Sequence, residues 1–111
     1  MGKMQREKGK LGEREVANLL KKFGFDGKRT AQYCGKAGTA DVTGIDGIHI
    51  EVKWQETTKI HEWMKQAEND AQENETPCVF HRRNNERWLC TLPLIDFLQI
   101  VREALNESDI Y

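Results

Sequence analysis

Two carboxylates and an amine lie near one short stretch of alternating residues. From Ile48 to Trp54, every second residue is apolar, and the residues between them include Glu51 and Lys53. Successive side chains of a β-strand point to opposite faces, so Glu51 and Lys53 share one face and the apolar residues share the other. This pattern predicts a strand with one face in the core and one face that carries an acid beside an amine.

A hairpin determines where a second acid, Asp41, lies relative to this strand. A two-residue turn would place Asp41 opposite Val52, on the apolar face. A three-residue loop over 45–47 ends at Gly47, where glycine suits the left-handed conformation that closes such a loop, and it places Asp41 opposite Glu51. The three-residue loop is preferred because it has the glycine that it requires and because the shorter turn would leave a carboxylate facing the core. It collects Asp41, Glu51 and Lys53 on one polar face.

Two neighbouring carboxylates repel each other unless a cation lies between them. Mg²⁺ prefers such oxygen ligands, and it can activate a water and stabilise the charge on a phosphate under attack. The Lys53 amine would then lie beside that water or phosphate, where it could position the nucleophile or neutralise developing charge. An ordinary cross-strand ion pair on a solvated face explains the same spacing equally well.

The order of these residues resembles the signature of the PD-(D/E)XK nuclease superfamily. Asp41 is followed, after nine residues, by Glu51-x-Lys53, and Ala40 stands where the family often has proline. More narrowly, residues 8–54 look like the archaeal-type Holliday junction resolvases and their phage relatives. In those proteins a glutamate on the first helix and a glycine-rich basic loop precede the Asp. The second half of the chain resembles them only in outline.

The resemblance implies a Mg²⁺-dependent DNA endonuclease of recombination or repair, with Mn²⁺ as a substitute metal and a four-way DNA junction as the substrate. It implies that Glu13, Asp41, Glu51 and the carbonyl of Val52 hold the metal. Lys53 would orient or activate the water that displaces the 3′-oxygen and leaves a 5′-phosphate. The catalytic residues implied are therefore Glu13, Asp41, Glu51 and Lys53.

The assignment of Glu13 depends on the resemblance. We expect a helix from about Leu11 to Gly24, and an acid in its first turn is favoured by the helix dipole whatever its function. Glu15 is the competing candidate, about two residues round the same helix.

Basic residues are concentrated in the first third of the chain. Residues 1–36 hold ten Lys or Arg against four acids, whereas residues 37–111 hold seven against fourteen. Such a run favours a polyanionic partner, although a solvated basic arm without a partner is also common. The candidate DNA-binding side chains lie in this third, in the loop before Asp41, on the helix after Lys53 and near a turn in the second half: Lys8, Lys10, Arg14, Lys36, Thr39, Gln66, Arg82 and Arg83.

The remaining periodicities predict the elements that position these residues. We expect a helix, a first strand within 25–34, strands over 40–44 and 48–54, a helix over 60–71, two strands over 78–83 and 87–92, and a helix after Pro93. The apolar stripe of the helix after Pro93 is attributed to core packing. The order gives an α/β domain with one mixed sheet, in keeping with the restriction-endonuclease-like fold that the resemblance implies. Residues 1–9 are expected to form a mobile basic arm, 10–106 the nuclease domain and 107–111 a short tail.

Composition excludes several other classes of protein. The chain has 111 residues, a net charge of −1, and no apolar run of membrane-spanning length, and its start lacks the apolar segment of a signal peptide. Its three cysteines form no CxxC, so neither a disulfide framework nor a zinc site is indicated. We therefore expect a cytoplasmic protein, in the host cytoplasm if it is phage-encoded, with no membrane partner and no small-molecule cofactor.

A four-way junction has approximate two-fold symmetry, and cutting two opposed strands requires two active sites. A symmetric homodimer is therefore expected, with exposed apolar residues near Trp54, Trp63 or the last helix as possible parts of its interface.

Three alternatives to this function remain open. The chain could be a nuclease of the same superfamily that acts on nicked, flapped or damaged DNA, a DNA-binding accessory protein that does not cut, or a protein-interaction module.

Overall fold

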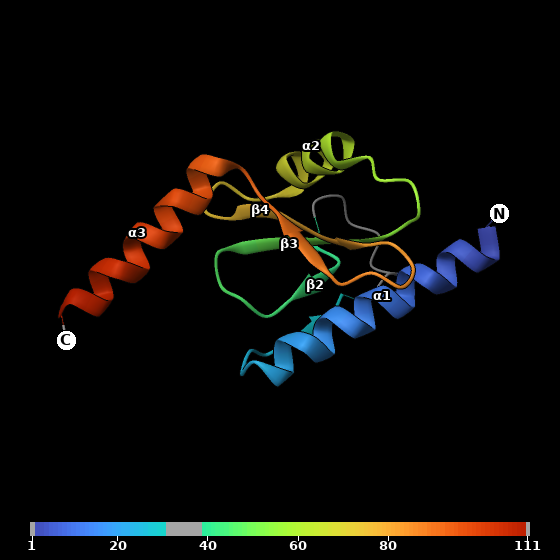
Figure 1. Ribbon diagram of the computed structural model, residues 1–111, viewed down its shortest axis with the longest axis horizontal. Helices are drawn as coiled ribbons and strands as arrows, with labels where there is room; N and C mark the ends of the chain where they lie inside the picture. The colour runs from blue at the N-terminus through green and yellow to red at the C-terminus, as the bar shows by residue number, and fades with distance from the viewer. Residues whose placement is uncertain (1, 31–38, 111) are drawn as a thin grey trace.

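The computed structural model describes the backbone of residues 2–30 and 39–110 and the side chains of residues 4–30 and 39–107. A five-stranded sheet lies at its centre, in the order β1-β2-β3-β4-β5, with β3 and β4 parallel and the other neighbours antiparallel. Figure 1 shows the elements, whose bounds are α1 (Gly2–Lys22), β1 (Lys28–Arg29), β2 (Val42–Thr43), β3 (Ile48–Trp54), α2 (Ile60–Asp70), β4 (Thr76–Arg82), β5 (Leu89–Thr91) and α3 (Leu94–Ile110). The sequence prediction of an α/β domain with a mixed central sheet is confirmed.

Helices cover both faces of the sheet. The face that carries Ile50 and Val52 packs against α1, through a cluster that includes Val16 and Leu20. On the other face, Trp63 of α2 packs with Val79 of β4. The apolar side chains of β3 are therefore buried under α1, and its polar side chains lie on the face of α2 rather than in open solvent. Figure 1 shows the two helices on opposite sides of the sheet.

The hairpin has the register that a three-residue loop requires. Val42 lies opposite Ile50, and the amide of Ile48 donates to the carbonyl of Ile45 across the turn at 3.2 Å. Gly47 has φ +81°, a conformation that glycine adopts without steric cost. The register that the preferred loop predicts is thus confirmed. The hydrogen bond from Ile48 to Ile45 closes a turn with Asp46 and Gly47 at its centre, and Asp41 immediately precedes β2.

The first helix starts earlier than the sequence analysis predicts. It begins at Gly2 instead of about Leu11, so the predicted start of this helix is wrong. The residues over 3–8 are good helix formers, so the helix can extend without an apolar face to guide it. Glu13 consequently lies in the middle of a 21-residue helix, where a helix dipole gives no reason for an acid.

The last helix leaves the body of the molecule, as Figure 1 shows. It runs to Ile110, so part of the expected tail over 107–111 is helical. Large apolar side chains along it, among them Leu94 and Leu98, are exposed. Attributing its apolar stripe to core packing is therefore wrong, because periodicity shows that a helix has an apolar face and does not show what covers it. No helix in the described residues is long and apolar enough to cross a membrane.

Candidate active site

Asp41 is fixed at the point where the β2 ladder ends. Its amide donates to the carbonyl of Ile50 at 3.0 Å, and its Oδ2 accepts a hydrogen bond from the amide of Val52 at 2.9 Å. The N–H and C=O of one strand residue point to the same neighbouring strand, so the Val52 carbonyl is directed toward the side on which Asp41 lies. The backbone of β3 thus holds the Asp41 carboxylate beside a carbonyl oxygen.

The carboxylate of Glu51 lies next to Asp41 and is almost completely buried, with 2% of the residue exposed. Burial and the neighbouring negative charge of Glu51 together raise the pKa of Asp41 to about 7, although the hydrogen bond from Val52 opposes the rise. The two acids therefore cannot both be ionised without cost. Together they form a negatively charged pair that a cation would stabilise.

Lys53 follows on the same face of β3, two residues beyond Glu51, and is partly buried. Across the parallel ladder it lies opposite His81, so no acid faces it from β4. Among the described residues its ammonium makes no ion pair, which leaves its three N–H donors available. Such a group can bind a phosphate oxygen or a water beside the two carboxylates.

Glu13 reaches the region from α1 but is held by an arginine. The Nε and Nη2 of Arg29 donate to its Oε1 at 3.2 and 3.1 Å. Glu13 contributes to the raised pKa of Asp41, more weakly than Glu51 does, so it lies within electrostatic reach of the pair. The competing Glu15 accepts from Arg82 and from the indole of Trp88. Of the two glutamates, only Glu13 is a contributor to the electrostatics of Asp41.

A histidine completes the environment of Glu51. The Nε2 of His49 lies 2.7 Å from Glu51 Oε1, its Nδ1 lies 3.7 Å from Glu75 Oε1, and only 1% of the residue is exposed. The hydrogen bond to Glu51 raises the pKa of His49, which favours the imidazolium form. The sequence analysis did not select His49, although the two-residue period of β3 places it on the face of Glu51.

The carboxylates expected to share a metal are not all equally close. Within the described residues, His49, Glu51 and Asp70 have ligand atoms within 4.8 Å of one another, and Glu13, Asp41 and Glu51 form no second group of that kind. Glu13 is turned toward Arg29, and one oxygen of Glu51 is turned toward His49. Asp41 and Glu51 are therefore the expected metal ligands that the structure brings together most clearly.

Sequence comparison agrees with this arrangement. The chain matches the family of phage putative PDDEXK endonucleases over residues 4–110. It belongs to this family. A search of curated proteins found no match.

The fold of this endonuclease family member is similar to that of a solved resolvase. The structure of Hjc, a Holliday junction resolvase from the archaeal hyperthermophile Archaeoglobus fulgidus, is 22% identical in sequence, with a TM-score of 0.59 over 77% of this chain and 72% of Hjc. At this identity the likeness establishes the restriction-endonuclease-like fold. Eight chains of known structure match in all.

The candidate DNA-binding residues of this endonuclease differ in whether neighbouring side chains already bind them. Lys10, Arg14, Thr39 and Gln66 are exposed. Three others are held by neighbours: Lys8 pairs with Glu56, Arg82 pairs with Glu15 and stacks on Trp54, and Arg83 pairs with Glu86. Lys36 lies outside the described residues. The exposed residues are thus better placed to meet a phosphate than the arginines near the β4–β5 turn.

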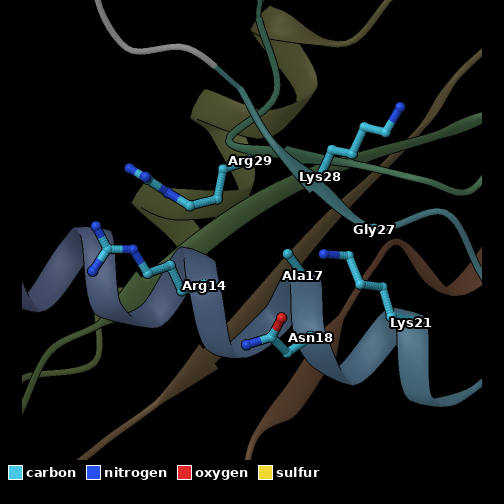
Figure 2. A pocket seen from close by; sticks show the side chains of 7 residues that line it. All are labelled: Arg14, Ala17, Asn18, Lys21, Gly27, Lys28 and Arg29. Atoms are coloured by element: carbon cyan, nitrogen blue, oxygen red, sulfur yellow. The ribbon is translucent and has the colours of Figure 1, made fainter.

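A basic groove lies beside Glu13, Asp41 and Glu51, which together are called the acid cluster. The sequence analysis missed most of the residues that line this groove. It runs between α1 and the segment that leads into β1, encloses about 350 Å³, and is lined by Arg14, Lys21, Lys28 and Arg29, with Ala17, Asn18 and Gly27 at its floor and wall (Figure 2). Gly27 permits this close approach, because a Cβ there would lie 2.3 Å from the carbonyl oxygen of Ala17. The concentration of charge over 1–36 was the signal that pointed to this groove.

Proposed function

We propose that this chain is a divalent-metal-dependent DNA endonuclease that resolves four-way junctions as a homodimer. The observation that carries the proposal is the pair of neighbouring acids Asp41, which is partly buried, and Glu51, which is buried. Lys53, whose ammonium makes no ion pair within the described residues, lies on the same face of β3 as Glu51. Membership of a family of putative endonucleases supports the reaction class. The fold of a Holliday junction resolvase supports the choice of substrate.

The donor set suits a hard divalent cation. Burial and the charge of Glu51 raise the pKa of Asp41, so a cation beside Asp41 would stabilise its ionised form. Carboxylate and carbonyl oxygens are the ligands that Mg²⁺ prefers. Asp41, Glu51 and the carbonyl of Val52 would hold it, with Glu13 as a further carboxylate and Mn²⁺ as a substitute. When bound, such an ion lowers the pKa of a water and stabilises negative charge on the phosphate.

The protein's own groups supply the remaining chemistry. Lys53 would hold the attacking water or a phosphate oxygen through its free N–H donors, next to the carboxylates. Its fixed positive charge would stabilise the phosphate as negative charge develops, at no cost of reorganisation. The displaced group is the 3′-oxygen, so the product carries a 5′-phosphate.

The DNA would approach along the basic groove and the exposed cations of α1. Arg29 links the two regions, since it lines the groove and also pairs with Glu13. The backbone of a duplex would then lie along α1, with one phosphate at the acid pair. Contacts of this kind position the substrate without reading its sequence.

Cleavage of synthetic DNA tests the proposal. Purified protein is incubated in Mg²⁺ with a four-way junction, a linear duplex and a flap of the same sequence, and we expect cleavage of the junction at least about ten times faster than that of the other two. Equal rates on all three would reject junction resolution and retain the nuclease. No cleavage of any substrate, with binding intact, would leave the non-cutting accessory protein as the better assignment.

The site is tested by a matched pair of lysine variants. Lys53→Ala should lower the cleavage rate by at least about 100-fold, because it removes charge stabilisation that acts in the transition state. Lys65→Ala removes an exposed lysine on α2, outside the acid cluster, and should cleave at the wild-type rate. Normal cleavage by Lys53→Ala would show that the site is elsewhere.

A further inference from the structure

The last helix exposes an apolar face over most of its length. Leu94, Ile95, Phe97, Leu98, Ile100 and Leu105 have between 38% and 68% of their surface exposed. Figure 1 shows α3 extending away from the sheet, with neither α1 nor α2 beside it. A surface of this size is unusual on a monomeric protein and commonly marks a place where another molecule binds.

Most of these apolar residues form one continuous stripe, and Ile95 and Ile100 flank it on its two sides. At 100° per residue, Leu94, Phe97, Leu98, Val101 and Leu105 fall within an arc of about 100°. The charged side chains Asp96, Glu103 and Glu107 lie on the opposite side of the helix. The helix is therefore amphipathic in the manner of an element that packs along its length against another surface.

Helices of this length gain most of their stability from packing of an apolar face, and isolated ones are marginal in water. In the described part of the chain, α3 packs extensively against no other element. Some other surface must therefore cover the stripe, and it must be apolar over about 16 Å, which is the distance along the helix from Leu94 to Leu105.

We propose that α3 packs antiparallel against α3 of a second copy of this chain, about a two-fold axis between Gln99 and Ile100. In that register Leu94 of each copy meets Leu105 of the other, and Leu98 meets Val101, so the stripe is complementary to itself. Such matching is what a symmetric dimer interface requires. The acids of α3 remain on its outer side, away from the contact.

The available area supports a second copy as the occupant. Four of the six exposed apolar side chains, Leu94, Phe97, Leu98 and Leu105, lie in the stripe. At roughly 100 Å² of exposed surface each, they offer on the order of 400 Å² per copy, about half of the ~800 Å² per partner in a standard interface. Leu89, half exposed on the edge strand β5 shortly before α3, can add to it. This surface specifies how the homodimer of the proposed function is built, and its existence does not depend on the cleavage chemistry.

The oligomeric state of the full chain tests the proposal by sedimentation equilibrium. We expect a dimer with a Kd of about 10 µM or tighter. The double substitution Leu98→Glu and Val101→Glu should raise that Kd at least about 100-fold, because it would bury four unpaired charges. Gln99→Glu adds one charge per chain on the polar side and should leave the Kd unchanged, and circular dichroism of all three proteins checks folding.

Cross-linking tests the orientation. In a background in which Cys34 and Cys90 are replaced by serine, the double variant Leu94→Cys and Leu105→Cys should form covalent dimers on oxidation. Leu94→Cys alone should not, since an antiparallel pair keeps its two copies about 16 Å apart along the axis.

Three outcomes would overturn the proposal. A wild-type chain that is monomeric at 100 µM would show that a different partner covers α3. A dimer that persists in the Leu98→Glu and Val101→Glu variant would place the interface elsewhere. Efficient cross-linking of Leu94→Cys alone would show parallel helices. Each is measured without DNA, so failure here is separate from failure of the proposed nuclease activity.

Discussion

Asp41 carries a carboxyl group whose ionisation opposes folding when no cation is present. Burial and the charge of Glu51 raise its pKa from 3.8 to about 7. Between these values the folded chain holds a proton that the unfolded chain has lost, so the free energy of unfolding decreases as the pH rises. The stabilisation is complete below about pH 4 and is lost by the time the pH has passed about 7.

Asp41→Asn should therefore stabilise the metal-free protein at high pH. At pH 8 in EDTA, we expect the free energy of unfolding to exceed that of the wild type by about 2 kcal/mol, since the buried charge is removed and the amide oxygen can still accept from Val52. At pH 4 the two proteins should be equally stable. Denaturant unfolding at both pH values measures the difference.

The effect of Mg²⁺ on stability is the control for the Asp41→Asn comparison. Adding Mg²⁺ at pH 8 should stabilise the wild type and have little effect on the variant, which has lost a ligand. Calorimetry should show that metal binding to the wild type at pH 7 releases protons. An Asp41→Asn variant that is less stable than the wild type at pH 8, or that binds Mg²⁺ equally well, would contradict the assignment.

His49 compensates the buried charge of Glu51, so its removal should be costly. His49→Ala would leave a nearly fully buried carboxylate without its 2.7 Å hydrogen-bond partner, and we expect a loss of about 2 kcal/mol in the free energy of unfolding. His49→Gln keeps an N–H donor near the position of Nε2 and should recover at least half of that loss. Denaturant unfolding compares the three proteins. Equal stability of His49→Ala and the wild type would mean that His49 does not stabilise Glu51.

At the scale of elements, the sequence predicted the structure best where the alternation of side chains and the turn residues indicated the same strand pairing. The alternation over 48–54 predicted β3, and glycine at position 47 selected the correct hairpin register. Both are local properties. The membership of Glu13 in the site required the family resemblance, because nothing in the helical pattern distinguishes it from Glu15.

Contacts between distant elements could not be predicted in the same way. The Arg29 that holds Glu13 comes from a two-residue strand with little periodicity. The sequence pattern of α3 is the same whether a core or a second chain covers it, so its exposure was not predictable. His81 is buried against Trp63 by the parallel pairing of β3 with β4, which only the tertiary structure shows.

The groove between α1 and β1 should contribute to DNA affinity through charge alone. Lys21→Ala and Lys28→Ala should each weaken binding of a junction by an inactive Asp41→Asn chain. Each should also reduce the slope of log K against log salt by about 0.9, the value for one phosphate contact. Lys65→Ala on α2 should leave both quantities unchanged. Fluorescence anisotropy over a series of salt concentrations measures them, and slopes that do not change would remove the groove from the DNA path.

At the scale of the whole molecule, one chain offers one acid pair, whereas resolving a junction requires two cuts. Two copies joined by α3 would supply two sites related by a two-fold axis, which matches the approximate symmetry of the substrate. Each cut then depends on a separate copy. The number of strands cut should therefore follow the number of active copies in a dimer.

Mixed dimers test this dependence. Wild-type chain exchanged with an equal amount of Lys53→Ala chain should give about one quarter fully active dimers and one half dimers with a single active site, if pairing is random. On a supercoiled plasmid that extrudes a cruciform, wild-type dimers should produce linear DNA by paired cuts, and mixed dimers should produce nicked circles by one cut. The ratio of nicked to linear product should therefore rise several-fold over that of wild-type protein diluted to the same activity. An unchanged ratio would mean that each chain cuts independently of a partner, and the coupling between α3 pairing and junction resolution would have to be abandoned.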